Sequence, residues 1–472
     1  MHAPHFVRRL VGTALFLLGL SVPPLLAQTI RYVKPSAPPG GNGLTWATAY
    51  QTIPPAVAAA AAGDEIWVAE SSYPAPAGGY VINKRLGIYG GFKGTENDRA
   101  HRLGSYVGTI LEGDIGVAGN PLDNVPHVLS TTGVAGIGGG AGLLLDGFLI
   151  QNGYAQGAGV NGAGILAVQT DLDLANCFLR HNFAPGALTG NANAGGGVYF
   201  TSYVGGVAPP LGSQLRIKNC EFSDNTGCKG GALYADLARG VVVNTEFLGN
   251  RAFPYGAGAY VTRNGTGTRL DFTNCIFWNN SCSTATGLGA GIYVDDNGAG
   301  LGGNVQAVNC TLADNSGSAG TDGQAIVVSA NSTLDVANSI LYFNGSGGGG
   351  VPAPIFGAAT ASYSDIEGTS LYPGTGNILH DPQFANHGIG RLTLRLTPPS
   401  LCLDAADYGR LPADVLDVDL DGNFLEPIPL DVGALLRLVD QASIADSGVG
   451  SFAGPYACST CTYLDMGALE RP

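Results

Sequence analysis

Residues 219–234 read NCEFSDNTGCKGGALY, and the first seven of them form a phrase that recurs along the chain. The phrase is Asn, two residues, Phe or Leu, two residues, Asn, and it occurs six times. The copies run from Asn176 to Asn182, Asn219 to Asn225, Asn244 to Asn250, Asn274 to Asn280, Asn309 to Asn315 and Asn338 to Asn344. A looser copy runs from Asp146 to Asn152. Successive full copies start 25 to 43 residues apart, which predicts coils with fixed strands and loops of variable length.

Four copies are followed by a cluster of Gly and Ala and then by an apolar residue and Tyr. The clusters are Gly195 to Tyr199, Gly230 to Tyr234, Gly256 to Tyr260 and Gly289 to Tyr293. Apolar residues alternate with period two in this region, as at Val198 and Phe200, which favours short strands over helices. One coil cannot bury its inner face alone, so we expect the coils to stack about 4.8 Å apart into an all-β parallel solenoid. In that stack the second asparagines of the phrase should align in one column parallel to the solenoid axis, namely Asn182, Asn225, Asn250, Asn280 and Asn315.

The composition supports this prediction and excludes several other classes of protein. The chain of 472 residues contains 74 glycines, and charged residues make up 12% of it. A mostly helical protein is unlikely to be so rich in Gly, and a hydrophobic content of 45% is too high for a disordered linker. With a net charge of -14, the chain has no electrostatic footprint for nucleic acid or anionic lipid. We therefore expect no nucleic-acid partner.

The first 27 residues have the pattern of a secretory signal peptide. Arg8 and Arg9 precede an apolar run from Leu10 to Leu20, and Ala27 offers a small residue for cleavage. A membrane anchor is the alternative, but the run is short and Pro23-Pro24 follows it. No other segment reaches 18 apolar residues, so we expect no membrane span after cleavage and a secreted or cell-surface location.

The repeat resembles that of right-handed parallel β-helix proteins of the pectin-lyase-like type, including the polymorphic outer-membrane-protein repeat with its Phe-x-x-Asn and Gly-Gly-aliphatic-Tyr phrases. Residues near the C-terminus resemble the region called choice-of-anchor Q. These residues are 363–368, 381–384, 400–407 and the closing phrase 464–470. The resemblance implies a right-handed parallel β-helix. It implies no single activity, because this scaffold carries lyases, hydrolases, adhesins and proteins with no known activity.

The predicted organisation has four parts. Residues 1–27 are the signal peptide, 28–70 an N-terminal cap with the first strand, 71–375 the β-helix, and 376–472 an irregular C-terminal cap region. Pro54-Pro55 before an alanine run that ends at Gly63 predicts a short capping helix. Such caps are expected because an open end of a solenoid exposes strand edges and apolar interior.

Two columns of repeated residues are predicted to point inward. The first contains Phe222, Phe247, Phe277 and Leu312. The second contains Cys177, Cys220, Cys275 and Cys310, with Thr245 in the remaining coil. Neighbouring coils are close enough for disulfides, but buried thiols are the alternative. Cys458 and Cys461 form a separate pair, and we expect one of them to be oxidised, with the other or with Cys402.

The candidate ligand-binding residues are four tyrosines at one repeat position, Tyr199, Tyr234, Tyr260 and Tyr293. If Val198 and its equivalents face inward, these rings face outward in one column. An outward column flanked by acids and hydroxyls suits stacking against sugar rings. The alternative is an aromatic ladder whose rings stack only on one another.

Candidate catalytic residues lie on the same face and apply only if the protein is an enzyme. Asp236 and Asp295 are expected two coils, about 9.6 Å, apart, near the upper end of the separation in inverting glycosidases. A lyase would need a base such as Arg263 beside a calcium carboxylate. Neither reaction has a sequence signature here.

A candidate calcium loop contains Asp417, Asp419 and Asp421, at alternate positions before Gly422. A plain polar turn is the alternative, because the bidentate Glu of an EF-hand is absent. No other cofactor is indicated.

Three functions remain open from the sequence. The first is non-catalytic binding of extracellular polysaccharide or cell-surface components. The second is a polysaccharide lyase or glycoside hydrolase acting on the Tyr and Asp face. The third is a structural or adhesive spacer, which needs only the stack of coils.

Overall fold

The structure is a computed structural model, and it describes fourteen stretches of the chain. These are residues 28–102, 106–157, 159–185, 193–203, 212–263, 268–283, 286–296, 298, 300–317, 324–345, 353–386, 394–436, 447 and 464–470. The predicted signal peptide and the predicted Cys458 and Cys461 pair lie outside these residues. No helix in the described stretches is long and apolar enough to cross a membrane.

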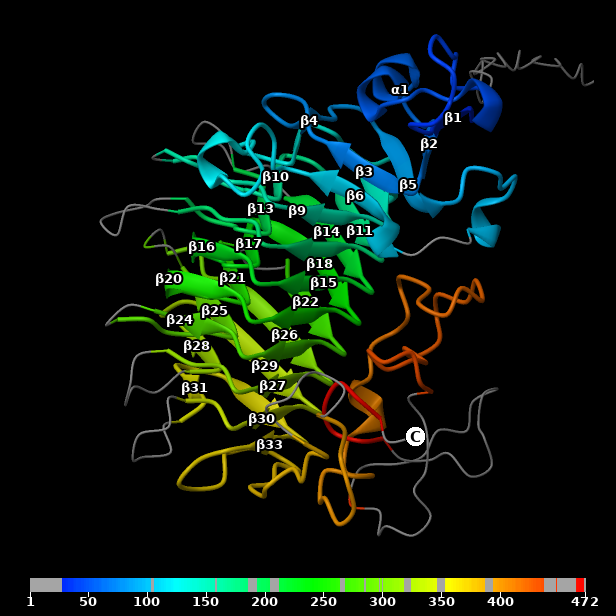
Figure 1. Cartoon of the computed structure of the whole chain (residues 1–472). Helices are drawn as coiled ribbons and strands as arrows, with labels where there is room; N and C mark the ends of the chain where they lie inside the picture. Colours follow the sequence, from blue (N-terminus) through cyan, green and yellow to red (C-terminus); the bar gives the residue numbers. More distant parts are fainter. Residues whose placement is uncertain are drawn as a thin grey trace, which may run out of the picture.

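Parallel strands form three long sheets that run the length of the molecule (Figure 1). The eleven-stranded sheet contains, in spatial order, β1 (Ile30–Val33), β2 (Glu65–Ala69), β5 (Leu86–Phe92), β8 (Leu143–Asp146), β11 (Leu172–Ala175), β14 (Ser213–Lys218), β18 (Ala238–Val243), β22 (Leu270–Thr273), β26 (Asn304–Val308), β29 (Thr333–Ala337) and β32 (Thr360–Ser362). The ten-stranded sheet contains β3 (Ser71–Pro74), β6 (Thr109–Glu112), β9 (Leu149–Gln151), β12 (Phe178–Arg180), β15 (Glu221–Ser223), β19 (Glu246–Leu248), β23 (Ile276–Trp278), β27 (Thr311–Ala313), β30 (Ile340–Tyr342) and β33 (Asp365–Ile366).

The nine-stranded sheet contains β4 (Tyr80–Val81), β7 (Leu129–Thr132), β10 (Ile165–Val168), β13 (Val198–Thr201), β17 (Leu233–Asp236), β21 (Ala259–Thr262), β25 (Ile292–Asp295), β28 (Ile326–Val328) and β31 (Ile355–Phe356). A short fourth sheet contains β16 (Thr226–Lys229), β20 (Arg251–Tyr255) and β24 (Ser281–Cys282). Nine successive coils each contribute one strand to every long sheet, and β1, β32 and β33 are the additional strands of the two longer sheets, so the predicted parallel solenoid is confirmed.

Helical structure in the described residues is short. The one α-helix is α1 (Ile53–Ala59), which begins at the proline pair and lies at the N-terminal end of the stack, as predicted (Figure 1). Its buried residues are Ile53 and Ala56. The 3-10 turns are η1 (Trp46–Thr48), η2 (Arg99–His101), η3 (Tyr106–Gly108), η4 (Pro121–Asp123) and η6 (Tyr408–Arg410).

The predicted interior columns are confirmed. The rings of Phe222, Phe247 and Phe277 stack with centroids 5.1 and 4.5 Å apart, and Leu312 continues the column. All four side chains are fully buried. The equivalent cysteines Cys177, Cys220, Cys275 and Cys310 are buried free thiols, and so is Cys402. The thiol alternative therefore holds in the ladder, whereas the predicted oxidation of Cys458 or Cys461 concerns residues outside the described stretches.

The second asparagine of each phrase forms the predicted column along the solenoid axis. Each side chain donates Nδ2–H to the Oδ1 of the next, at 2.9 to 3.1 Å, in the order Asn182, Asn225, Asn250, Asn280, Asn315 and Asn344. The same amides also donate to backbone carbonyls, as Asn250 does to Phe222 at 2.8 Å. This buried ladder joins consecutive coils through their side chains.

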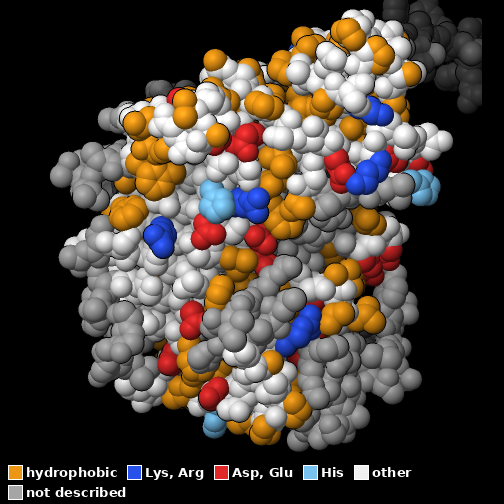
Figure 2. Space-filling model, in the orientation of Figure 1, with side chains coloured by type: hydrophobic (Ala, Val, Ile, Leu, Met, Phe, Trp, Pro, Cys, Tyr) orange, Lys and Arg blue, Asp and Glu red, His pale blue; other side chains and the backbone are white. Residues whose placement is uncertain are grey.

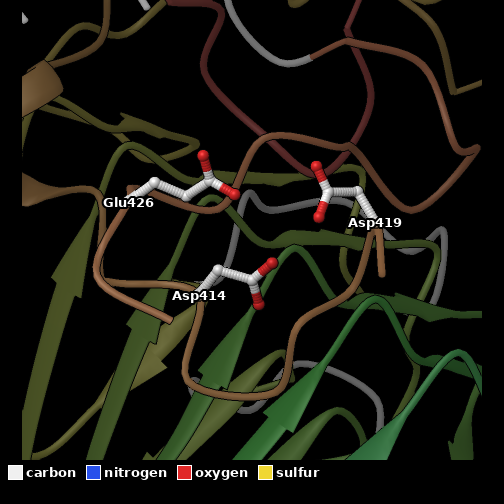
Figure 3. Close-up of side chains that lie close together, drawn as sticks. All are labelled: Asp414, Asp419 and Glu426. Atoms are coloured by element: carbon white, nitrogen blue, oxygen red, sulfur yellow. The ribbon is translucent and has the colours of Figure 1, made fainter. Parts of the chain in front are cut away.

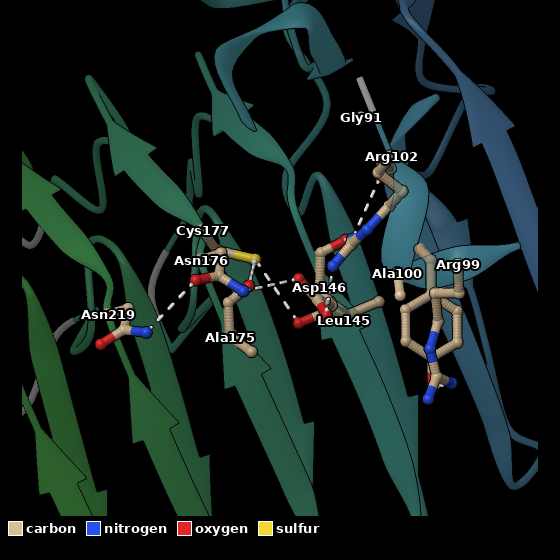
Figure 4. A network of polar contacts seen from close by, with 12 residues as sticks. Gly91, Arg99, Ala100, Arg102, Leu145, Asp146, Ala175, Asn176, Cys177 and Asn219 are labelled. Atoms are coloured by element: carbon tan, nitrogen blue, oxygen red, sulfur yellow. Dashed lines mark hydrogen bonds and ion pairs between the residues drawn. The ribbon is translucent and has the colours of Figure 1, made fainter. Parts of the chain in front are cut away.

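The looser copy is placed one residue away from the position that the sequence suggested. Asp146 pairs with Ala175, not with Asn176, and Gln151 pairs with Arg180. Gly153, rather than Asn152, therefore lies beside Asn182 and donates its N–H to it at 3.0 Å. Asp146 instead accepts a hydrogen bond from Asn176 at 2.9 Å and another from Arg102 at 3.0 Å (Figure 4).

The described C-terminal region lies along the flank of the solenoid (Figure 1). Lys218 on β14 donates to the carbonyl of Leu416 at 2.8 Å, and Asn274 donates to that of Leu430 at 2.8 Å. Val418 packs with Val243 on β18. The region is irregular, as expected, but it covers the side of several coils as well as the end.

Candidate functional site

The four candidate tyrosines form one column on the nine-stranded sheet. Tyr199, Tyr234, Tyr260 and Tyr293 pair in register across β13, β17, β21 and β25. Consecutive rings are nearly parallel, with centroids 4.8, 5.3 and 5.3 Å apart. The neighbouring residues Val198, Leu233, Ala259 and Ile292 point into the core and are fully buried. The predicted alternation is therefore confirmed.

The column is not exposed along its whole length, as a platform for binding sugar rings would require. Tyr234 is 7% exposed and Tyr260 is 0% exposed, while Tyr199 and Tyr293 are half-buried. Side chains from the fourth sheet lie against the rings. Lys229 on β16 is 4.9 Å from the Tyr260 centroid, and the Tyr255 ring on β20 is 4.8 Å from that of Tyr293. Burial raises the pKa of Tyr199 and Tyr293 to about 12.

Asp236 is held in a buried ion pair. Its side chain is 1% exposed and accepts hydrogen bonds from Thr201 Oγ1 at 2.8 Å and from Arg263 Nε at 2.7 Å. A second nitrogen of Arg263 also contacts this carboxylate, so the pair is bidentate. The Arg263 guanidinium lies 4.3 Å from the centroid of the Tyr203 ring. Two of the three candidate catalytic residues, Asp236 and Arg263, are thus paired with each other.

Asp295 lies in the same row of the sheet as Asp236, two coils away, as predicted. It accepts a hydrogen bond from the hydroxyl of Tyr260. That hydroxyl in turn accepts one from Lys229 Nζ at 3.0 Å. Burial lowers the pKa of Lys229, and the negative charge of Asp295 opposes this shift. These hydrogen bonds connect the Tyr column to two charged side chains, Lys229 and Asp295.

A different aromatic pair lines an open depression on the surface. Tyr154 and Phe183 lie on successive coils, and their rings stack with centroids 5.5 Å apart and an interplanar angle of 19°. Both are half-buried. The depression has a volume of about 610 Å³, and its other lining residues are Asp114, Gly119, Pro121, Asn124, Asn152, Gly153 and His181.

The turns that follow β9 and β12 place this pair. Asn152 and His181 directly follow these strands with φ of 63° and 54°, the left-handed conformation that turns the chain. Asn124 donates to the carbonyl of Asn152 at 2.8 Å, which joins η4 to the turn. The repeat gives no signal for this site, because both rings lie outside the repeated phrase. The one-residue displacement of the looser copy brings Tyr154 beside Phe183.

The predicted calcium residues lie in an exposed loop, and two further acids lie beside it. Asp417, Asp419 and Asp421 can each bring a carboxylate oxygen within 4.8 Å of the others. Asp419 does the same with Asp414 and Glu426, whose carboxylates point toward it (Figure 3). The sequence spacing did not reveal Asp414 and Glu426.

Comparison with known proteins gives the handedness of the coil. Residues 137–351 match the family model described as "Right handed beta helix region". The solenoid is a right-handed parallel β-helix. No curated protein sequence is detectably similar to the whole chain.

Several solved structures are similar to this β-helix at low identity. Pectate lyase Pel9A has a TM-score of 0.45 and 12% identity, over 94% of this chain and 97% of that one. A rhamnogalacturonan lyase has a TM-score of 0.36 and 11% identity, over 71% and 87%. The pectin methylesterase from Aspergillus niger has a TM-score of 0.29 and 14% identity, over 71% and 87%.

Proposed function

We propose that the protein is exported and binds polysaccharide outside the cytoplasm without transforming it. The observation that carries this proposal is the stacked pair of Tyr154 and Phe183 in an open depression. Aromatic side chains combine a large apolar face with defined geometry, which suits the flat face of a sugar ring. The signal-like segment 1–27 supports export.

One polar residue beside the pair suits recognition of hydroxyl groups. His181 is exposed at the depression, whereas the side chains of Asp114, Asn124 and Asn152 form hydrogen bonds within the protein. A few polar groups on an otherwise apolar surface are typical of small-ligand sites. Figure 2 shows charges of both signs in small groups on one face of the molecule. This distribution supports recognition through rings and hydrogen bonds more than through one strong field.

The state of the candidate catalytic residues supports binding without catalysis. A general acid or base must reach the proton that it moves. The Asp236 carboxylate is buried and bonded to Thr201 and Arg263, and Arg263 has its guanidinium in the same pair. No observation favours the lyase or hydrolase alternatives at this face.

The proposal is tested by affinity electrophoresis of the exported protein in gels that contain homogalacturonan, xylan, mannan or alginate. The double variant Tyr154→Ala/Phe183→Ala should lose at least tenfold in affinity for the polymer that retards the wild type. Phe356→Ala is the matched control, because Phe356 is an exposed ring that does not line the depression. It should behave as the wild type.

Two results would contradict the proposal. One is that no polymer retards the wild type, and the other is that the double variant is retarded equally. The same polymers are incubated in solution, and the ultraviolet absorbance of unsaturated lyase products and the release of reducing ends are followed. Either signal would show that the protein transforms its ligand.

A further inference from the structure

In the acidic cluster beside the C-terminal loop, two buried carboxylates each have one oxygen that accepts a hydrogen bond and one that lacks a partner. Asp414 is 1% exposed, and its Oδ1 has no hydrogen-bond partner. Glu426 is 8% exposed, and its Oε1 also has none. Figure 3 shows both carboxylates and that of Asp419 directed at a common point. Buried acceptors of this kind are rare, because leaving them unpaired is unfavourable.

Within the part of the chain that the structure describes, the charge of the cluster is also not balanced by an ion pair. Among the described residues, no Lys or Arg forms an ion pair with Asp414, Asp419 or Glu426. Buried carboxylates are stable as ions only when they are paired or when they coordinate a metal. Asp414 and Glu426 are buried and Asp419 is exposed, and each can bring a carboxylate oxygen within 4.8 Å of the others, so a cation between them would compensate the charge of all three.

We propose that Asp414, Asp419 and Glu426 bind a calcium ion. All the available ligand atoms are oxygens, which hard cations prefer, whereas zinc sites use nitrogen and sulfur. Asp417 and Asp421 share Asp419 as a neighbour and bring further oxygens to the same loop. Calcium takes six to eight oxygens in flexible geometry, while magnesium demands a strict octahedron. A loop with this many carboxylates fits calcium better.

The position of the ion suggests what its binding does. The backbone N–H of Asp414 donates to the carbonyl of Glu426 at 2.7 Å, so the ligands close a loop at its base. The loop is attached to the solenoid by Lys218, which donates to the carbonyls of Leu416 and Asp417 at 2.8 and 3.2 Å. Val418 and Ile428 on either side pack with Val243. The ion would therefore fasten the C-terminal region to β14 and β18.

The test uses the full exported chain, dialysed against EDTA and then titrated with calcium chloride by calorimetry, with magnesium chloride in parallel. We expect calcium to bind with a dissociation constant of about 10⁻³ M or tighter, and magnesium more weakly. Calcium should raise the midpoint of thermal unfolding, since a ligand that binds only the folded state stabilises it. Asp414→Asn and Glu426→Gln should each weaken calcium binding at least tenfold.

The thermal unfolding midpoint of each variant in EDTA shows whether a variant has lost its fold or only its calcium site. There Asp414→Asn removes a negative charge from an unoccupied cluster, so its unfolding midpoint should equal or exceed that of the wild type. Asp381→Asn, an exposed aspartate outside the cluster, should bind calcium as the wild type does. Absence of calcium binding to the wild type would overturn the proposal. Unchanged affinity in both cluster variants would overturn it as well, and if Asp414→Asn does not fold, Glu426→Gln decides alone.

Discussion

At the scale of single residues, the two asparagines of each phrase have different physical roles. The first takes the left-handed conformation, with φ between 48° and 54°, at Asn176, Asn219, Asn244, Asn274, Asn309 and Asn338. Asn tolerates this region better than most residues. The second asparagine is instead the buried member of the amide ladder, and the left-handed residue stands just before it, as His181 does before Asn182. Asn thus occurs at the first position because its backbone tolerates the left-handed conformation, and at the second because its side-chain amide forms the ladder.

A buried acid near the last coil gives a prediction at the same scale. Asp365 is fully buried, and its Oδ2 accepts a hydrogen bond from the thiol of Cys402 at 3.2 Å. Burial raises the pKa of Asp365 to about 7, above its ordinary value of 3.8. The folded state therefore holds this proton more tightly than the unfolded state does. Its contribution to stability is complete below about pH 4 and is lost as the pH rises to about 7.

Asp365→Asn should remove that part of the pH dependence, because the amide does not titrate. The variant should gain free energy of unfolding relative to the wild type between pH 4 and pH 7, by up to about 4 kcal/mol at 1.36 kcal/mol per pH unit. Urea denaturation at several pH values measures the difference. Asp224→Asn, an exposed aspartate, should run parallel to the wild type. A constant difference between Asp365→Asn and the wild type would contradict the prediction.

At the scale of elements, the tyrosine column belongs to the packing between two sheets. The rings extend outward from β13, β17, β21 and β25, but residues of β16 and β20 lie against them. The column is therefore an aromatic ladder with a covered centre and two half-buried ends. Tyr234 and Tyr260 are buried in this column, so their rings are part of the packing of the fold.

Tyr260→Ala should consequently destabilise the protein by about 3 to 5 kcal/mol, as expected for truncation of a large buried aromatic side chain. Tyr293→Ala should have a smaller effect, because that ring is half-buried at the end of the column. Denaturant unfolding of both variants, followed by far-ultraviolet circular dichroism, provides the comparison. Equal and small effects would show that the rings are less tightly packed than their burial indicates.

At the scale of the whole molecule, segments distant in the sequence meet along the flank of the solenoid. Asn338 donates to the carbonyl of Asp407 at 2.8 Å and accepts a hydrogen bond from its N–H at 2.8 Å. Farther up the stack, Lys218 holds Leu416 and Asp417. The described C-terminal residues thus run back along coils formed about 200 residues earlier, with small apolar clusters of their own.

Lys218→Met should loosen this docking without unfolding the coils. It removes the hydrogen bonds to two backbone carbonyls, while the ladder and the interior columns remain intact. We expect faster proteolytic cleavage within residues 411–436, because weakly attached segments open locally at low free energy. Limited proteolysis with mass spectrometry identifies the cut sites. Lys93→Met, which affects an exposed ion pair with Glu70, should leave that cleavage rate unchanged.

The repeated phrase was sufficient to predict the strands, their inward faces and the columns of Asn, Phe and Cys. A stack of similar coils places equivalent residues above one another, so residues at the same position of the repeat are neighbours in the structure. Burial of Tyr260, the contact of Tyr154 with Phe183 and the meeting of Asp414 with Glu426 depend on the tertiary structure. These features arise from irregular turns and from packing between segments outside the sequence repeat. The surrounding atoms decide whether a ring is open to a ligand and whether an acid lacks a partner, and no local sequence pattern specifies those atoms.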